Sequence, residues 1–375
     1  EGKTPLLLAC EIGSLEIFEK IIANESVVYD KRGDISILQA SCLSKNLGLV
    51  KAAAAKSKSS FTYSTPTTMT PLSNACSRGS IEIVKYLIEE HNVDYNQQEY
   101  ISQIPLNMAC KNGQDEVAFY LFQLPKIILT GDSLVLATAS NHIKIVQKIL
   151  SFDKNVFPFT DFGLEALCVA CKKGFFDIVQ LLVESEKIEL NPKTDKMGPL
   201  HYACKYGYPD IVRILINNPI VDINLFSTEE IDRKKALLTP DKIPNPHHMS
   251  PLHFAIKENS TECARLLLED KRIDVNSKAH GKFCNSLTPL HFAVRARNIP
   301  VLKMLYMHKE LDKYSRFERA GPDFVSATDL AREYGFKEIE EFLLEFDPKE
   351  EDKEIARIQM KVDLNDFYNF EFVTS

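Results

Sequence analysis

Apolar residues recur along most of this chain in a two-part block. In the clearest copy, residues 198–224, a short segment that begins at Pro199 is followed by Gly207, and a second, strongly aliphatic segment follows Pro209. An extended Val-Asp-Ile-Asn sequence then leads to the next block. Glycine readily adopts the left-handed conformation that ends a helix. The pattern therefore predicts two short helices per block, of which the second carries most of the apolar side chains.

The block repeats with a period close to 33 residues. The residues that occupy the Pro199 position are Pro5, Ile37, Pro71, Pro105, Ser133, Ala166, Pro199, Pro251, Pro289 and Ala327. Their spacings are 32, 34, 34, 28, 33, 33, 52, 38 and 38, so five of the nine lie within one residue of 33. One pair of short helices cannot bury its apolar face alone, whereas stacked pairs can. The period therefore predicts an array of stacked helical pairs.

Four segments carry the strongest shared motif: TPLLLAC at Thr4–Cys10, TPLSNAC at Thr70–Cys76, SPLHFAI at Ser250–Ile256 and TPLHFAV at Thr288–Val294. They resemble the T-P-L-H-x-A signature of the ankyrin repeat family. The resemblance covers about residues 1–345. It implies an all-α ankyrin-repeat solenoid of about ten helix–turn–helix units with short hairpin loops, a curved elongated rod. It also implies a scaffold for protein partners, without specifying the partner.

Local signals support the helix boundaries. Thr or Ser at the first motif position can cap the first helix with its hydroxyl, and the proline beside it fits the first helical turn. Glycines stand where the first helix is expected to end, at Gly13, Gly79, Gly113, Gly174, Gly207 and Gly335.

The spacings also predict a domain organisation. Residues 1–225 hold repeats 1–7, of which the second is irregular: its second helix contains Ala52–Ala55, and a Ser/Thr-rich mobile loop follows at 57–68. Residues 226–248 form an inserted loop that divides the array, residues 249–345 hold repeats 8–10, and residues 346–375 form an acidic and aromatic tail. The chain enters within a motif, so we expect a preceding turn or repeat upstream.

Charge and composition exclude several classes of function. The net charge is −7, and residues 338–354 alone carry nine acidic residues and two lysines, so the remaining array is nearly neutral. Bulk charge therefore argues against nucleic-acid binding. No apolar run approaches the roughly 18 residues of a membrane helix, and the first residues are not a signal peptide.

Cysteine and histidine recur, but at motif positions. Six cysteines share one position, Cys10, Cys42, Cys76, Cys110, Cys171 and Cys204. We interpret them as small buried side chains that stay reduced in an intracellular, cytoplasmic protein, and Cys168–Cys171 as part of the repeat rather than a redox or zinc pair. His201, His253 and His291 share the fourth motif position, where a neutral imidazole bonds the backbone of a neighbouring turn. We find no catalytic, metal or cofactor motif, and predict no cofactor and no metal.

A candidate binding surface comes from the two residues before each helix-ending glycine. The family resemblance places these positions on the exposed concave face. From the third unit onward they hold seven positive charges and one negative charge. The basic row consists of Arg78, Lys111, Lys172, Lys173, Lys205, Lys257 and Arg295, with Tyr206 as a central aromatic anchor. Met197 is added as an exposed turn-tip candidate. The hypothesis is a groove for an acidic segment, and the alternative is an ordinary solvated face.

Several functions remain open at this point. The leading prediction is a non-enzymatic, monomeric scaffold or adaptor that binds protein or peptide partners on its concave and hairpin-tip surface. An alternative is a regulatory ankyrin module of a larger protein, a channel or an enzyme, whose effector domain lies outside this chain. A spacer without a specific ligand, and an autoinhibited scaffold whose groove binds Glu338–Glu354, are further alternatives. An enzyme is least supported, since no acid–base set has catalytic spacing.

Overall fold

The computed structural model describes residues 4–23, 35–57, 60–62, 64, 68–97, 103–153, 159–194, 196–228, 248–281, 284–319 and 324–345. The chain divides into two compact units, Glu1–Glu189 and Leu190–Ser375, here called the N-terminal and C-terminal units. In the described residues, a helical pair stands at each of the ten aligned motif positions. The predicted solenoid of stacked helical pairs is therefore confirmed.

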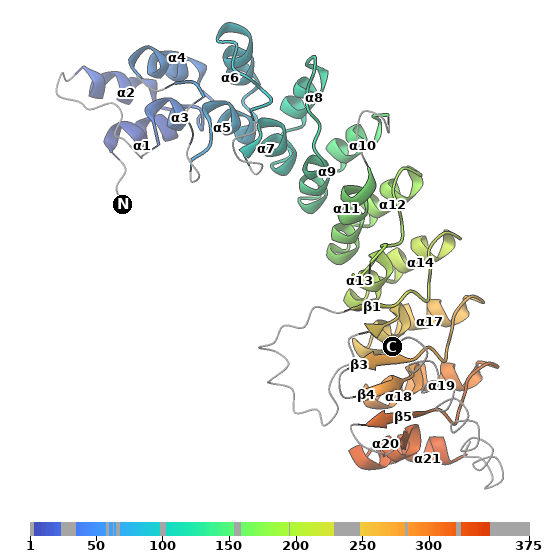
Figure 1. Ribbon diagram of the computed structural model, residues 1–375. Helices are drawn as coiled ribbons and strands as arrows, with labels where there is room; N and C mark the ends of the chain where they lie inside the picture. The colour runs from blue at the N-terminus through green and yellow to red at the C-terminus, as the bar shows by residue number, and fades with distance from the viewer. Residues whose placement is uncertain are drawn as a thin grey trace, which may run out of the picture. The chain divides into compact units, whose positions relative to one another are not determined.

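The N-terminal unit contains six pairs in two layers (Figure 1). The first helices are α1 (Pro5–Ile12), α3 (Ile37–Ser41), α5 (Pro71–Arg78), α7 (Pro105–Lys111), α9 (Gly131–Ala139) and α11 (Thr160–Lys173), each packed on the next. The second helices are α2 (Leu15–Ile22), α4 (Leu47–Lys56), α6 (Ile81–Lys85) with the π-helix η1 (Tyr86–Glu90), α8 (Asp115–Gln123), α10 (Ile143–Leu150) and α12 (Phe176–Glu184).

The C-terminal unit contains four pairs built in the same way. Its first helices are α13 (Pro199–Tyr206), α16 (Pro251–Lys257), α18 (Pro289–Arg295) and α20 (Ala327–Tyr334), and its second helices are α14 (Pro209–Asn217), α17 (Thr261–Glu269), α19 (Ile299–Met307) and α21 (Lys337–Glu345). Its hairpins add six short antiparallel strands in the order β1 (Ser227–Thr228), β2 (His248–Met249), β3 (Ala279–Gly281), β4 (Cys284–Leu287), β5 (Arg316–Arg319) and β6 (Phe324–Ser326). These strands were not predicted from the sequence pattern.

The insertion leaves and re-enters the chain at neighbouring strands. Ser227 pairs with Met249, and Thr228 pairs with His248. The helices that flank the insertion pack on each other, α13 on α16 and α14 on α17. Both ends of the insertion therefore belong to one hairpin ladder, and the division of the array at 226–248 stays a prediction. Residues 229–247 and the tail from residue 346 onward lie outside the described residues.

The predicted helix ends are largely confirmed. The six motif glycines have φ between +65° at Gly113 and +86° at Gly13. The hydroxyls of Thr4 and Thr70 accept the backbone N–H groups of the third helical residues, at 3.3 and 3.1 Å. At Ser250 and Thr288 the motif histidine completes a capping box, and the hydroxyl also lies 2.8 and 2.9 Å from its Nδ1 atom. Histidine therefore takes part in the cap of these pairs.

Two details of the irregular second repeat become visible. In α4, Leu49, Val50 and Ala53 are fully buried, so the alanine-rich helix is packed on its neighbours. In the predicted mobile loop 57–68, the ring of Phe61 stacks on His91 with the centroids 4.2 Å apart. No described helix of either unit combines the length and apolar character that crossing a membrane requires.

Candidate functional site

The basic row lies at the C-terminal turns of the first helices. Arg78 ends α5, Lys111 ends α7, and Lys172 and Lys173 end α11. Each helix stops there because a left-handed residue or a turn follows, which leaves the last side chains outside the packed interface between helices. Basic side chains at this end also interact favourably with the helix dipole. The position is therefore compatible with a binding surface and with simple helix stabilisation.

In the N-terminal unit, all four members of the basic row are exposed. The Lys173 ammonium donates a hydrogen bond to the Ala139 carbonyl of α9, at 2.6 Å, and lies 5.8 Å from the Phe175 ring. Lys173 therefore also joins the last pair of this unit to the pair before it. Arg78, Lys111 and Lys172 present their charges in the same layer of first helices.

In the C-terminal unit, the row lies closer to the packed surface. Lys205, Lys257 and Arg295 are half-buried. The ammonium groups of Lys205 and Lys257 lie 6.0 and 5.8 Å from the buried Phe254 ring. Lys257 also forms an ion pair with Glu258 at 3.7 Å, which offsets its charge. The positive charge of this unit is therefore less available than that of the N-terminal unit.

Tyr206 is the exposed aromatic residue of the row. Its side chain is 43% exposed and stacks on Tyr202, with centroids 6.5 Å apart and planes at 16°. Tyr202 is not among the residues predicted for this surface, although its spacing of four residues from Tyr206 on a helix predicts the contact. Met197 differs from the expectation of an exposed turn tip: it is half-buried, in a hairpin where Pro192 packs directly against the adjacent Gly198.

The motif histidines are not available for catalysis or metal binding. In His201 and His253, Nδ1 accepts the backbone N–H three residues earlier, at 3.2 and 3.3 Å. Nε2 therefore carries the proton and donates it to the carbonyls of Leu225 and Leu287, at 2.8 and 3.1 Å. Burial lowers the pKa of His201 to about 4, of His253 to about 3 and of His291 to about 4. The neutral, backbone-bonded interpretation is confirmed for His201 and His253.

Cys168 and Cys171 are also unsuited to chemistry. Burial raises the pKa of Cys168 to about 12 and that of Cys171 well above its usual range. A thiol held in its protonated form is a poor nucleophile and a poor metal ligand. Within the described part of the chain, no group of three or more His, Cys, Asp or Glu side chains is arranged to hold a metal ion.

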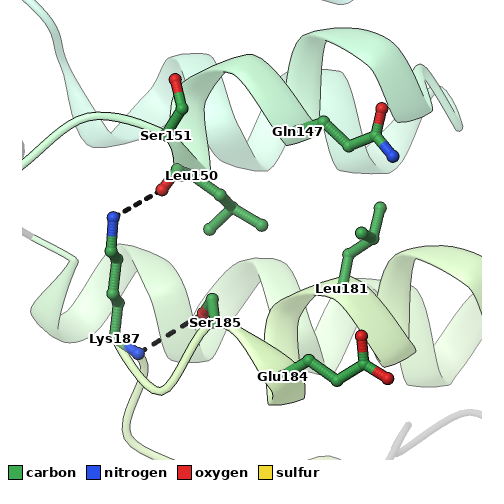
Figure 2. A pocket seen from close by; sticks show the side chains of 7 residues that line it. All are labelled: Gln147, Leu150, Ser151, Leu181, Glu184, Ser185 and Lys187. Carbon is green, nitrogen blue, oxygen red and sulfur yellow. Dashed lines mark hydrogen bonds between the residues drawn. The ribbon is translucent and has the colours of Figure 1, made fainter.

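A shallow pocket of about 340 Å³ lies between the C-terminal ends of α10 and α12 (Figure 2). Lys187 crosses it, and its ammonium donates hydrogen bonds to the carbonyls of Leu150 and Phe152, at 2.6 and 2.7 Å. Leu150 is the last residue of α10 and Phe152 follows two residues later, at a helix end where a cation is favourable. Since a side chain of the protein itself satisfies these acceptors, we interpret the pocket as a contact between repeats rather than as a ligand site.

Comparisons with known proteins agree with the repeat pattern. The family described as "Ankyrin repeats (3 copies)" matches residues 38–129, 134–227 and 231–316, which together exceed half of the chain. Among solved structures, the crystal structure of the human ASB11 ankyrin repeat domain is similar at 22% sequence identity, with a TM-score of 0.46, over 65% of this chain and 98% of that one. The search of curated proteins finds no match.

Proposed function

Since this chain belongs to the ankyrin repeat family, whose repeats are generally protein–protein interaction modules, we propose that it is a non-enzymatic scaffold or adaptor. Its partner is a protein or peptide with an acidic segment. The observation that carries this proposal is the exposure of Arg78, Lys111, Lys172 and Lys173 in one layer of helices.

In this proposal the exposed basic side chains steer and orient the acidic partner. An exposed ion pair contributes about 0.2–1 kcal/mol, and salt screens it over about 10 Å at 0.1 M. Four such pairs cannot supply tight binding alone, so buried anchors on the partner must add to them.

Buried thiols at the repeated cysteine position support an intracellular, cytoplasmic location, and we propose that the chain acts as a monomer.

The test is a charge reversal with a matched control. A fluorescein-labelled glutamate-rich peptide is titrated with wild type, with the double variant Lys111→Glu and Lys172→Glu, and with the double variant Lys56→Glu and Lys144→Glu. Lys56 and Lys144 are exposed on second helices, so both variants change the net charge equally. We expect about tenfold weaker binding for the first variant at low salt, equivalent to about 1.4 kcal/mol. Equal weakening in both variants would leave only non-specific attraction and contradict the proposed surface.

A further inference from the structure

Two neighbouring pairs of the N-terminal unit differ from most others at the fourth motif position. The side chain at this position is buried in seven pairs, at Leu7, Gln39, Ser73, Asn107, His201, His253 and His291. In the second pair, for example, the Gln39 amide donates a hydrogen bond to the Met69 carbonyl of the segment that follows, at 2.8 Å. In the fifth and sixth pairs the position holds Val135 and Cys168, which are only half-buried. These two pairs therefore expose part of a surface that is normally closed.

The chain around these two pairs departs from the repeat pattern. The motif spacing before the fifth pair is 28, so only residues 124–130 connect α8 to α9. Helix α11 begins at Thr160, six residues before its motif position at Ala166, whereas the other first helices begin within two residues of theirs. The added turns bring Phe162 onto α9, so closely that a Cβ atom on Gly131 would overlap the Phe162 ring. A short connection and a lengthened helix thus shape this part of the unit.

Four apolar side chains form a surface on these two helices, here called the α9–α11 face: Val135, Leu136, Phe162 and Val169. Phe162 is 37% exposed, and the other three are half-buried. Phe162 and Val169 are seven residues apart, about two helical turns, so they lie on the same side of α11. The face therefore combines an aromatic ring with aliphatic side chains that water reaches.

Contacts at both ends of α9 keep the face continuous. Helices α9 and α11 pack side by side (Figure 1). Phe162 lies against Gly131 at the start of α9, and Lys173 donates a hydrogen bond to the Ala139 carbonyl at its end, at 2.6 Å. In the third pair, the residue at the place of Val169 donates a hydrogen bond to the carbonyl of the preceding pair at the place of Val135. Val135 and Val169 are therefore neighbours across the two helices, and the face extends over about 13 Å.

The two ends of the α9–α11 face carry opposite charges. Lys172 and Lys173 are exposed at the C-terminal end of α11, and Asp161 and Glu165 are exposed in its N-terminal half, beside Phe162. This order of charges also suits the helix dipole, so the apolar side chains between the charges are what distinguish the face from an ordinary solvated one. A complementary segment has apolar side chains in the middle, acidic residues at one end and a basic residue at the other.

We propose that the α9–α11 face is the anchor site for such a segment of a partner protein. Aliphatic side chains of the segment pack on Val135, Leu136 and Phe162, its acidic end lies toward Lys172 and Lys173, and its basic residue lies toward Glu165. The site rests on the proposed function and deepens it, because it receives the buried anchors that the exposed basic side chains need for useful affinity. Removal of apolar surface from water drives this contact, and charge sets its direction.

The test uses a pair of fluorescein-labelled peptides of equal charge. Both carry a lysine at one end and glutamates at the other. The leucine peptide has leucines between them, and the alanine peptide has alanines at the same places. Fluorescence anisotropy measures the binding of each peptide to the full chain. We expect the leucine peptide to bind about tenfold more tightly than the alanine peptide, because only its side chains bury apolar surface on the face.

Matched substitutions locate this leucine preference on the protein. Phe162→Ala and Leu136→Asn change the face. Phe176→Ala and Leu181→Asn are their controls on the second helix α12, where Phe176 is 41% exposed and Leu181 is half-buried. We expect the preference to fall below about threefold in the first two variants and to remain about tenfold in the controls. Circular dichroism checks the fold of each variant, and Phe162→Ala decides the outcome if Leu136→Asn does not fold.

Three outcomes would overturn the anchor site. The two peptides could bind wild type equally, or the face variants and the control variants could lose the leucine preference equally. Alternatively, Phe162→Ala could abolish binding to vesicles of anionic lipid, or self-association in sedimentation, while neither peptide is preferred. That result would make a lipid surface or a second copy the occupant.

The anchor site and the proposed function can fail separately. The glutamate-rich peptide of the charge-reversal experiment contains no leucine, so its binding depends on the basic row and not on the α9–α11 face. Loss of the leucine preference alone would contradict the anchor site and leave the basic row in place. An unaffected charge reversal together with a persistent leucine preference would contradict the basic row instead.

Discussion

The two compact units connect successive helical pairs with different side chains at the same place. In the C-terminal unit the fourth motif position holds His201, His253 and His291, followed by Asp329. In the N-terminal unit it holds Leu7, Gln39, Ser73, Asn107, Val135 and Cys168.

Gln39 shows that the histidine role can be filled without an imidazole. Its Oε1 accepts the Ser36 N–H at 2.8 Å, and its Nε2 donates to the Met69 carbonyl at 2.8 Å. His253 makes the same two kinds of contact with its two ring nitrogens. A neutral amide can therefore supply the acceptor and the donor that histidine supplies at this position, whereas histidine makes the connection dependent on pH.

The largest difference between the units is expected on acidification. The pKa values of about 4, 3 and 4 for His201, His253 and His291 lie below the value of about 6.5 for an unfolded chain. The unfolded chain therefore takes up protons first, so the stability contributed by neutral histidine is complete above about pH 6.5 and is lost as the pH falls toward 4. Between pH 7 and 5 we expect the free energy of unfolding to fall by about 2 kcal/mol per histidine, roughly 6 kcal/mol for the three.

Hydrogen exchange at the two pH values, corrected for intrinsic rates, measures this difference. Protection should fall in α13, α16 and α18 and change little in α3, α5 and α7. The variant His253→Gln gives the C-terminal unit a neutral amide like that of Gln39 and should remove about a third of the pH dependence of stability. Equal loss of protection in both units would contradict the assignment to the histidines.

Removal of a motif histidine should have the next largest effect. His253→Ala removes a fully buried ring that packs on Phe292 and leaves the Ser250 N–H and the Leu287 carbonyl without their partner. We expect a loss of about 3 kcal/mol in the free energy of unfolding, from the cavity and the unsatisfied groups. Urea denaturation followed by circular dichroism measures it.

His142 in the N-terminal unit is the control for that substitution. It is half-buried, its ring packs against Gly113, and its Nε2 atom lies 3.2 Å from the Lys111 carbonyl oxygen. His142→Ala should cost less than about 1 kcal/mol. If His253→Ala and His142→Ala had equal urea denaturation midpoints, the buried imidazole would not be what joins the helical pairs of the C-terminal unit.

The smallest effect tests a connection that both units share. Asn224 donates to the Arg272 carbonyl at 2.7 Å and accepts the Asp274 N–H at 2.8 Å, and Asn96 does the same with Lys126 and Ile128, at 2.9 Å each. Because these bonds are exposed, Asn224→Ala and Asn96→Ala should each cost about 1 kcal/mol. A much larger loss for Asn224→Ala, measured by thermal denaturation, would indicate that the hairpin strands depend on this asparagine.

Local signals made much of this fold predictable. Gly13 and Gly207 end their helices with positive φ as expected. Glycine has no Cβ atom and adopts this conformation without steric cost, so its position in the motif predicts the helix end. The structural role of the motif histidines was predictable for a similar reason. A residue that recurs at one position of a repeat is expected to serve the repeat itself, and a catalytic role is not needed to explain it. The exposed positions of Arg78 and Lys111 were also accessible in this way, although their role as a binding surface stays a prediction.

What the sequence did not reveal depends on long-range contacts. The strands of two to four residues are too short for an alternating pattern, and pairs such as Cys284 with Arg319 join segments far apart in the chain. The π-helix at Tyr86–Glu90 and the partial burial of Met197 depend on neighbouring packing.

The pairing of Ser227 with Met249 has a practical consequence for engineering. Because both ends of the insertion are held in one hairpin ladder, the length of polypeptide between them is decoupled from the stacking of α13 on α16. A longer loop adds only a slowly growing closure entropy, about 0.6 kcal/mol for each doubling of its length. This junction is therefore a place in the chain where a fluorescent tag, an epitope or an unrelated folded domain can be grafted while the repeats stay in register.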